Sequence, residues 1–469
     1  MHTSTTSTVP LVSWTAAQLL EATQGYWLND QAPNTEIKRI LTDSRDAEAG
    51  DAFLALKGER FDAHAFITQV AEQGCQVAIV SQPIDAEICQ LVVPDTRLAL
   101  GQLGAYRRAQ NPQLKVIALT GSSGKTTTKE MLGSILSRIA PTLVTRGNLN
   151  NDLGVPVMLL ELRPEHQYAV MELGASHQGE IDYTSNLVQP LVAGIINIGT
   201  AHLGEFGGRD GICRAKSEIY AHIAPNGTSI VPAADDFADS IRQAVQTEQV
   251  LSFGAGGEIF ATEIELQAQS ATFKLNTPQG VRQVNLPFAG EHNVQNATAA
   301  AAFALAIGIS LDDIVLGLEQ AVGAKGRLNF IQQGRHLLID DTYNANPTSM
   351  RAAAEVLAQQ EGVRVMVMGD IGELGSSAAQ QHYMLGRDLV SVKGLNFVVA
   401  VGEFAPAAQE GARSTQYGKK MQAFLTQEQA LPFLLSLIET HQPQSMSFLF
   451  KGSRYTHMET LMADLMEKL

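Results

Sequence analysis

One segment constrains the fold of this 469-residue chain more than any other. The apolar run KVIALT (115–120) is typical of a buried strand, GSSGKT (121–126) of a glycine-rich turn, and TTKEMLGSILSRI (127–139) has the apolar spacing of a helix. A turn of this kind points backbone N–H groups and a helix N-terminus at an anion. The segment therefore predicts an α/β architecture with a phosphate-binding loop.

This loop departs from the most common phosphate-binding pattern. That pattern has four residues between its glycines, whereas two separate Gly121 from Gly124, and Leu119 stands where the first glycine would be. In a phosphate-binding loop, Lys125 would reach the terminal phosphates and the Thr126 hydroxyl would ligate Mg²⁺. The alternative is a turn rich in glycine and serine that carries a surface lysine. The loop does not decide between ATP and GTP.

The rest of the chain alternates between strand and helix patterns, which restart near residues 113 and 326. A chain of 469 residues holds about three domains at roughly 100–200 residues each. We predict a small N-terminal α/β domain (1–112), a central P-loop-type, mainly parallel sheet with helices (113–325), and a C-terminal Rossmann-like α/β domain (326–469). Within the central domain, ATFKLNTPQGVRQVNLPF (271–288) predicts an inserted hairpin.

Composition excludes several classes of protein. The 33 Lys and Arg residues against 48 Asp and Glu give a net charge of −15, so no global basic field attracts a nucleic acid. We find no apolar stretch of about 20 residues and no signal-peptide pattern at the N-terminus, which predicts a cytoplasmic protein without membrane insertion. Three cysteines without a CxxC pair argue against a disulfide framework and against structural zinc.

Three further residues are candidates for the chemistry of the loop. Glu172 closes the predicted strand YAVMEL, and His202 follows the predicted strand IINIGT, so both fall at the strand ends where α/β sheets place ligands. The alternatives are an exposed carboxylate and a hydrogen-bonded loop histidine. Lys216 follows Ile212 by four residues on the apolar stripe of a predicted helix, which continues through Ile219, Tyr220 and Ile223. The alternative is a lysine that extends its amino group to the solvent.

Ten short segments of the predicted central and C-terminal domains resemble those of the Mur ligases, and TDSR (42–45) with KG (57–58) extends the resemblance to the N-terminal domain. The two-residue glycine spacing of the loop is that family's own variant. The segments are TGSSGKTT (120–127), GNLNNDLGVP (147–156), ELGASHQGEI (172–181), AHLGEF (201–206), RAKSEIY (214–220), GEHNVQNATAA (290–300), GRLN (326–329), DDTYNANPTSM (340–350), MGDIGELG (368–375) and KGSR (451–454). The Asp-Asn-Pro-Arg signature of the branch that adds a diamino acid is absent. Folylpolyglutamate synthetases are similar in the central, nucleotide-binding region but lack the GNLNND and DDTYNANP segments. The resemblance is therefore to the branch that adds D-alanyl-D-alanine.

This resemblance implies an ATP-dependent amide ligation in peptidoglycan biosynthesis, and hence a part in cell shape and cell division. ATP would phosphorylate the terminal carboxylate of UDP-N-acetylmuramoyl-tripeptide, and the amine of D-alanyl-D-alanine would attack the acyl phosphate. The products would be the UDP-muramoyl-pentapeptide, ADP and phosphate. The implied cofactors are ATP and Mg²⁺, and we expect a monomer that binds no nucleic acid. Whether the tripeptide ends in diaminopimelate or lysine is left open.

The resemblance also assigns roles to individual residues. Those implied to bind ATP are Gly121, Ser122, Ser123, Gly124, Lys125, Thr126, Thr127, Asn293, Asn296, Arg327 and Asp341. The implied catalytic residues are Lys125, Glu172, His202 and Lys216, and the implied Mg²⁺ ligands are Thr126, Glu172, His202 and Lys216, the lysine as a carbamate formed with CO₂. The residues implied to bind substrate are Ser44, Arg45, Lys57, Asn148, Asn150, Asn151, Asn344, Asn346 and Arg454, with Lys451 as a further candidate for dipeptide or closure contacts.

Some of these residues also have alternative interpretations in which they bind no ligand. Asn293 and Asn296 fall at a predicted helix start, where asparagine is common as a cap. The Asp-Ser-Arg segment that contains Ser44 and Arg45 also fits an ordinary turn. A protein that binds a nucleotide and moves without ligating anything would account for the phosphate-binding loop, but not for the C-terminal segments.

Overall fold

The computed structural model describes residues 12–58, 61–200 and 203–469. Its chain divides into two compact units. The first unit comprises the chain up to Ala118 together with Ala140–Gly174 and Asp182–Pro190. The second comprises Leu119–Ile139, Ala175–Ile181 and Leu191–Leu469.

A five-stranded sheet forms the N-terminal part of the first unit, with the strand order β1-β5-β4-β3-β2. Its strands are β1 (Tyr26–Trp27), β2 (Ile40–Leu41), β3 (Ala52–Leu54), β4 (Val77–Val80) and β5 (Cys89–Val92), and its helices are α1 (Ala16–Thr23), α2 (Ile67–Glu72) and α3 (Thr96–Ala109). Strands β2 to β5 are parallel, and β1 pairs antiparallel with β5. Side chains alternate along β4, so Val77 and Ile79 enter one core and Ala78 and Val80 the other. The small N-terminal α/β fold predicted from the sequence is confirmed.

A six-stranded sheet carries the glycine-rich loop, with the order β11-β10-β9-β6-β8-β7. Its strands are β6 (Lys115–Thr120), β7 (Thr142–Val144), β8 (Tyr168–Glu172), β9 (Val192–Ile195), β10 (Thr228–Pro232) and β11 (Gln249–Phe253). The accompanying helices are α4 (Lys125–Ser137), α5 (Gly154–Leu160), α6 (Glu180–Val188), α7 (Leu203–Phe206), α8 (Arg209–Ser217), α9 (Ala238–Ala244), α10 (Glu291–Ala306) and α11 (Leu311–Glu319). The pairs β7–β8, β9–β10 and β10–β11 are parallel, as predicted.

One helix of this region is shorter than the sequence predicts. The apolar stripe around Lys216 was expected to continue through Ile219 and Tyr220, but α8 ends at Ser217 and a 3-10 turn covers Glu218–Tyr220. Both Ile219 and Tyr220 are nevertheless buried. The apolar pattern therefore reported burial correctly, because a 3-10 turn can bury the same side chains as a continued helix.

A three-stranded antiparallel sheet is inserted after the central strands, with the order β12-β13-β14. Its strands are β12 (Phe260–Leu266), β13 (Ala271–Thr277) and β14 (Gly280–Leu286). Strands β13 and β14 form the predicted hairpin, with Thr277 opposite Gly280. Strand β12, which was not predicted, pairs with β13 on its other side.

The C-terminal sheet has the order β15-β16-β20-β17-β18-β19. Its strands are β15 (Asn329–Gln333), β16 (His336–Asp340), β17 (Val363–Gly369), β18 (Phe397–Val401), β19 (Met421–Phe424) and β20 (Met446–Lys451). Its helices are α12 (Pro347–Ala358), α13 (Ala378–Ser391), α14 (Ala405–Arg413), α15 (Gln427–Thr440) and α16 (Met458–Met466). Strand β15 is antiparallel to β16, and the other neighbours are parallel.

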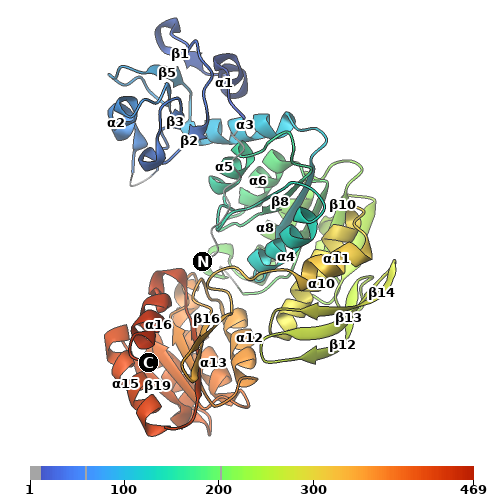
Figure 1. Ribbon diagram of the computed structural model, residues 1–469, viewed down its shortest axis with the longest axis vertical. Helices are drawn as coiled ribbons and strands as arrows, with labels where there is room; N and C mark the ends of the chain where they lie inside the picture. The colour runs from blue at the N-terminus through green and yellow to red at the C-terminus, as the bar shows by residue number, and fades with distance from the viewer. Residues whose placement is uncertain (1–11, 59–60, 201–202) are drawn as a thin grey trace. The chain divides into compact units, whose positions relative to one another are not determined.

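Helices cover both faces of this C-terminal sheet (Figure 1). Met366 and Leu449 pack into the core beneath α12, α13 and α14, whereas Val367 and Phe448 pack into the core beneath α15 and α16. A mainly parallel sheet with a core on each face is the Rossmann-like arrangement that the sequence predicts.

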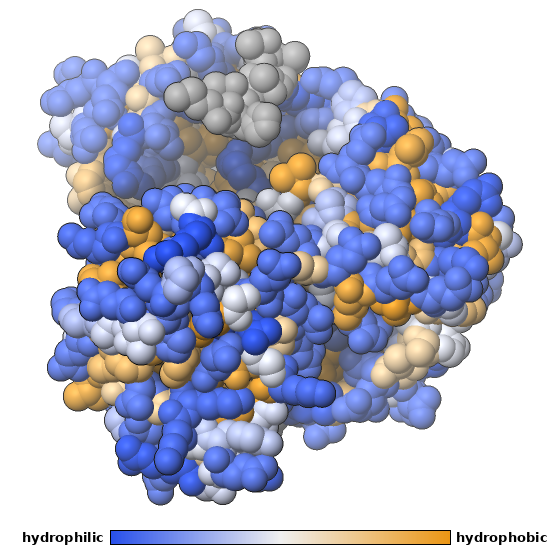
Figure 2. Space-filling model, turned by 60° about the horizontal axis from the view of Figure 1, so that its bottom comes forward, coloured by the Kyte–Doolittle hydropathy of each residue, from blue (hydrophilic) through white to orange (hydrophobic). Residues whose placement is uncertain are grey.

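The surface is that of a typical globular protein. In the view of Figure 2, hydrophobic residues lie in separate patches among hydrophilic ones. Some large hydrophobic side chains are exposed, among them Phe61 and Val322, which is normal for single residues on a protein surface. In the part of the chain that the structure describes, no helix is long and apolar enough to cross a membrane.

Candidate active site

The glycine-rich loop joins β6 to α4 in the second unit. Gly124 precedes the first residue of α4 and has φ +78°, a conformation that favours glycine. A Cβ atom at this position would lie 2.2 Å from Asn296 Oδ1. The Lys125 ammonium donates a hydrogen bond to the Gly121 carbonyl over 2.8 Å. The strand, loop and helix order predicted from the sequence is confirmed, and the left-handed backbone explains the second glycine.

Asn197, which follows β9, braces this loop. The Ser123 N–H donates to Asn197 Oδ1 over 3.0 Å, and Asn197 Nδ2 donates to the Ser123 carbonyl over 3.0 Å. The Ser122 N–H donates to the Asn197 carbonyl over 3.1 Å. The hydroxyl of Ser122 is buried and has no hydrogen-bond partner among the described residues. An orphaned hydroxyl in a loop of this kind fits a polar ligand such as a phosphate.

Asn293 and Asn296 lie in the first turns of α10, where they are 4% and 5% exposed. Asn296 Nδ2 donates to Asn293 Oδ1 over 3.0 Å, and Asn293 Nδ2 donates to the Ala289 carbonyl over 2.8 Å. The residue at the N-cap position is Gly290, and no side chain caps this helix. The alternative interpretation as helix caps is therefore wrong. The two asparagines form a buried hydrogen-bonded pair, and the Asn296 side chain lies against Gly124.

A pocket with a volume of about 650 Å³ opens beside the loop, within the size range of small-molecule sites. Its wall includes seven of the residues that the resemblance assigned to ATP, namely Ser123, Gly124, Thr127, Asn293, Asn296, Arg327 and Asp341. Sequence analysis missed other residues of the wall, among them Asn197, Arg209, Asp235, Phe288, His292 and Gln295. The structure thus gathers the loop, the start of α10 and the start of the C-terminal sheet around one cavity.

His292 is a missed wall residue with unusual electrostatics. Burial lowers the pKa of its imidazole to about 4, while the nearby Asp341 carboxylate acts in the opposite direction. The ring is therefore neutral at physiological pH. The signal available in the sequence was its position directly before Asn293 at the start of a predicted helix.

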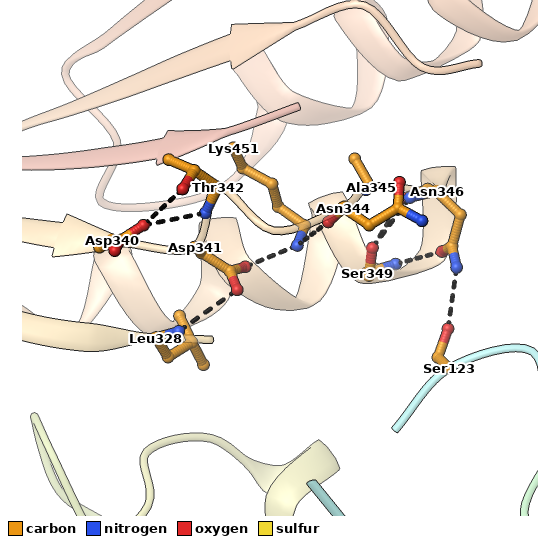
Figure 3. A network of polar contacts seen from close by, with 10 residues as sticks. All are labelled: Ser123, Leu328, Asp340, Asp341, Thr342, Asn344, Ala345, Asn346, Ser349 and Lys451. Carbon is orange, nitrogen blue, oxygen red and sulfur yellow. Dashed lines mark hydrogen bonds and ion pairs between the residues drawn. The ribbon is translucent and has the colours of Figure 1, made fainter. Parts of the chain in front are cut away.

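A polar network connects the C-terminal residues of this site (Figure 3). Lys451 Nζ lies 2.7 Å from Asp341 Oδ2 and donates to the Asn344 carbonyl over 3.0 Å. Asn346 caps α12 by accepting from the Ser349 N–H, and its Nδ2 donates to Ser123 Oγ over 3.0 Å. Asn346 thus contacts the glycine-rich loop, and its predicted role in substrate binding stays a prediction.

Glu172 and the asparagine segment lie in the first unit. Glu172 ends β8 and is 2% exposed, so its alternative interpretation as an exposed carboxylate is wrong. Asn150 Nδ2 donates to Glu172 Oε1 over 2.8 Å, and Asn151 Oδ1 accepts from the Gly154 N–H. Asn148 is exposed. The segment that contains these asparagines is therefore folded back onto the predicted metal ligand.

Of the other predicted metal ligands, Lys216 is described and His202 lies outside the described residues. Lys216 is 2% exposed, which contradicts the alternative in which its amino group extends to the solvent. In the described ranges, no group of three or more His, Cys, Asp or Glu side chains is arranged to hold a metal ion.

The residues predicted to bind the uridine diphosphate lie on the surface of the N-terminal sheet. The Arg45 side chain is 85% exposed and pairs with Asp43, whose carboxyl pKa it lowers to about 2 chiefly through a side-chain hydrogen bond. Lys57 Nζ lies 3.9 Å from Asp62. In the C-terminal domain, Arg454 is exposed and pairs with Glu459, and Asn344 is exposed. These residues do not border the pocket.

Comparisons with known proteins agree with this geometry. Three Mur ligase family models match the chain: the family's catalytic domain over 36–118, the middle domain over 119–304, and the glutamate ligase domain over 326–454. UDP-N-acetylmuramoyl-tripeptide--D-alanyl-D-alanine ligase of Escherichia coli is 41% identical, across 97% of this chain and 99% of that protein.

Two solved structures extend the likeness to three dimensions. UDP-N-acetylmuramoylalanyl-D-glutamyl-2,6-diaminopimelate--D-alanyl-D-alanyl ligase from Acinetobacter baumannii is 75% identical, with a TM-score of 0.91 over 98% of this chain and 100% of that one. MurF ligase from Thermotoga maritima in complex with ADP is 25% identical, with a TM-score of 0.79 over 92% of this chain and 97% of that one. From the fold, the pocket and the matches along its length, this chain belongs to the Mur ligase family of ATP-dependent ligases.

Proposed function

We propose that this protein ligates D-alanyl-D-alanine to UDP-N-acetylmuramoyl-tripeptide at the expense of ATP. The observation that carries the proposal is the 41% identity, along almost the whole chain, to the Escherichia coli ligase of that name. The pocket beside the glycine-rich loop supports it, since its size and its polar wall suit a nucleotide. The proposed place of this reaction is the cytoplasm, where ATP is available.

The proposed reaction has two steps. A carboxylate is a poor electrophile, so an oxygen of the tripeptide's terminal carboxylate first attacks the γ-phosphorus of ATP, and the bond to the β-phosphate oxygen breaks to release ADP. The neutral amine of D-alanyl-D-alanine then attacks the carbonyl carbon of the acyl phosphate. The tetrahedral intermediate expels phosphate and loses a proton from nitrogen, which leaves the amide. An α-amino pKa of about 7.7–8.0 leaves a substantial fraction of the dipeptide amine neutral near pH 7.5.

Pocket residues suit the first step. Lys125 would exchange its bond to the Gly121 carbonyl for phosphate oxygens, and the orphaned Ser122 hydroxyl would donate to them. Asn293 and Asn296 would face the adenine side. Arg327, whose buried Nε has no hydrogen-bond partner in the described part of the chain, would add positive charge from the C-terminal domain. Together these groups would position the γ-phosphate and stabilise the charge that develops during its transfer.

We propose Mg²⁺ as the cofactor on the chemistry of the residues that the resemblance assigns to it, one of them in a modified form. Thr126 supplies a hydroxyl and Glu172 a buried carboxylate, the oxygen ligands that Mg²⁺ prefers. Lys216 as an ammonium would repel the ion, whereas a carbamate on its Nζ would present anionic oxygens. His202 completes the proposed set. When bound, Mg²⁺ would neutralise phosphate charge and so favour attack by the carboxylate.

Each domain has a proposed substrate. Residues 1–112 would hold the UDP portion through Ser44, Arg45 and Lys57, residues 113–325 would hold ATP, and residues 326–469 would bring the dipeptide. Asn148, Asn150 and Asn151 would line the path of the muramoyl peptide. We propose diaminopimelate as the third residue of the tripeptide, because the name of the Acinetobacter baumannii ligase, at 75% identity, specifies it.

A ligation assay tests the proposal. The purified chain, MgATP, D-alanyl-D-alanine and either the diaminopimelate or the lysine tripeptide are combined, and products are identified by mass spectrometry. We expect pentapeptide and stoichiometric ADP, formed faster with the diaminopimelate tripeptide. ATP binding without any amide product would refute the ligase and favour a nucleotide-operated binding protein. Faster ligation of the lysine tripeptide would refute only the choice of third residue.

A further inference from the structure

Lys451 ends the central strand of the C-terminal sheet and is 2% exposed. Strand β20 lies between β16 and β17, with Phe450 opposite Asp340. The Asp341 N–H donates to the Phe450 carbonyl over 3.1 Å. This backbone bond sets Asp341 beside Lys451 at the end of two adjacent parallel strands, so the sheet itself brings the two charges together.

The Lys451 ammonium is engaged by protein groups. It lies 2.7 Å from Asp341 Oδ2 and donates to the Asn344 carbonyl over 3.0 Å (Figure 3). The Lys451 and Asp341 side chains are 3% and 8% exposed. Burial lowers the pKa of Lys451, and the Asp341 carboxylate opposes that effect. Because an unpaired charge at this depth is very costly, each member of the pair depends on the other.

The other oxygen of Asp341 holds the turn that carries Arg327. Asp341 Oδ1 accepts from the Leu328 N–H over 3.3 Å. The Tyr343 N–H donates to the Gly326 carbonyl over 3.2 Å, and Arg327 Cζ lies 4.4 Å from the centre of the Tyr343 ring. Lys451 thus supports this turn through Asp341, and its bond to the Asn344 carbonyl holds the 341–344 segment that begins with Asp341.

Asp340, the residue before Asp341, has a different structural role. Asp340 Oδ1 accepts from the Thr342 hydroxyl over 2.6 Å and from the Thr342 N–H over 3.2 Å, which closes the local turn. Asp341, by contrast, lines the nucleotide pocket together with Arg327 and Lys451. Loss of the Lys451 charge would therefore change the pocket wall by releasing the Asp341 carboxylate.

We propose that Lys451 is a positioning residue for the nucleotide site: it fixes the Asp341 carboxylate, directly and by holding the 341–344 segment, and through Asp341 it fixes the turn that presents Arg327 to the pocket. The inference rests on the proposed function for the identity of the pocket's ligand. It differs from the expectation that Lys451 contacts the dipeptide, because both recorded hydrogen bonds of its amino group are made to protein oxygens.

Nucleotide binding to four proteins tests this proposal. The Kd for ADP in the presence of Mg²⁺ is measured by titration calorimetry for the parent, Lys451→Met, Asp341→Asn and the double variant. We expect each single change to raise the Kd by about tenfold or more. We expect the double variant to stay within about twofold of Asp341→Asn, because a residue that acts through Asp341 has no further effect once Asp341 is altered.

A matched control separates this effect from the loss of any lysine ion pair. Lys274 also lies 2.7 Å from a carboxylate, that of Glu263, but on the exposed surface of the three-stranded sheet. Lys274→Met should keep the parent Kd for ADP.

Several outcomes would overturn the proposal. One is a parent-like Kd for Lys451→Met. Another is a double variant that binds ADP about tenfold more weakly than Asp341→Asn, since Lys451 would then contact the nucleotide directly. A raised KM for D-alanyl-D-alanine with an unchanged Kd for ADP would assign Lys451 to the dipeptide instead.

Two complications leave the test decisive. If Lys451→Met does not fold, the double variant avoids the unpaired buried charge, and its comparison with Asp341→Asn gives the answer. If the parent makes no pentapeptide, the proposed function fails, yet the Kd values for ADP still decide whether Lys451 acts through Asp341.

Discussion

At the scale of single residues, the site depends on a few close approaches. Gly124 is the sharpest case, because its backbone is left-handed and the side chain of Asn296 fills the place of a Cβ. The contact joins the loop to α10 without any space for a methyl group. The conformation of the loop and the placement of Asn296 are therefore coupled at this position.

Gly124→Ala should abolish most nucleotide binding. A Cβ 2.2 Å from Asn296 Oδ1 would displace either the loop or the asparagine, and we expect the KM for ATP to rise by about 100-fold. Gly308→Ala is the matched control, since Gly308 also has a positive φ of +87°. A Cβ atom added there would have no other atom of the described residues within 4 Å. This substitution should lower the free energy of unfolding by about 1 kcal/mol and leave the KM unchanged. Equal KM values for Gly124→Ala and the parent would contradict this assignment.

Lys216→Ala tests the proposed carbamate. We expect ligation to slow by about 100-fold or more, because the metal would lose an anionic oxygen ligand. Added short carboxylic acids should partly restore the rate by supplying that oxygen. Lys274→Ala, a surface change, should show neither the loss nor the rescue. Parent-like activity of Lys216→Ala would end the carbamate proposal, and a loss without rescue would point to a packing role for this buried lysine.

Local motifs and distant contacts were not equally predictable at this scale. The loop residues 121–126 are contiguous, so their chemistry is readable from the sequence. Asn197 is separated from Ser123 by 74 positions, and only the fold brings them together. Lys451 and Asp341 are likewise 110 positions apart. A lone asparagine after an apolar strand carries too little information for such a role to be assigned beforehand.

At the scale of secondary-structure elements, helix α13 contains a buried histidine that ties it to the end of β17. His382 Nε2 accepts from the Ile371 N–H over 3.0 Å, and Nδ1 lies 2.7 Å from the Ala378 carbonyl. Both contacts are satisfied by the neutral ring with its proton on Nδ1. A second proton on Nε2 would oppose the Ile371 N–H, and burial indeed lowers the pKa of His382.

This arrangement predicts a pH-dependent stability. Because the folded pKa lies below the ordinary value of 6.5, the unfolded state binds more protons as the pH falls below about 6.5, and stability falls with it. The contribution is at most about 1.4 kcal/mol per pH unit. Urea unfolding between about pH 7.5 and 5.5 should show a shallower loss for His382→Gln than for the parent.

The control for this comparison is His177→Gln, at a side chain that is 71% exposed, which should keep the parent's pH trend. Superimposable pH trends for the parent and His382→Gln would mean that the imidazole is protonated without hindrance in the folded state.

Elements were predicted best where burial was greatest. The central strands β6 and β8 are buried almost throughout and match the predicted apolar runs, whereas β9 ends at Ile195, the first residue of the predicted strand IINIGT. Strands β12 and β15 escaped prediction because they lie at sheet edges and expose many of their side chains. An edge strand needs no continuous apolar run, so its sequence resembles that of a loop.

At the scale of the whole molecule, the negative net charge of the chain is compatible with the anionic ligands that we propose. The net charge of −15 describes the sum over the chain, whereas Arg209, Arg327 and Lys451 gather positive charge at one pocket. An anionic nucleotide responds to the local field within about 10 Å, which is the range that salt leaves unscreened. The net charge thus argues against a polymeric nucleic acid as partner, but it carries no information on where the pocket lies.

The chain passes five times between its two compact units, after residues 118, 139, 174, 181 and 190. The first passage falls inside β6, three residues before Gly121. A single cut by a protease therefore cannot release either unit as a separate fragment, and neither unit can be exchanged between relatives as one uninterrupted piece of gene. Any continuous piece of chain that keeps β6 together with the glycine-rich loop therefore carries residues of both units.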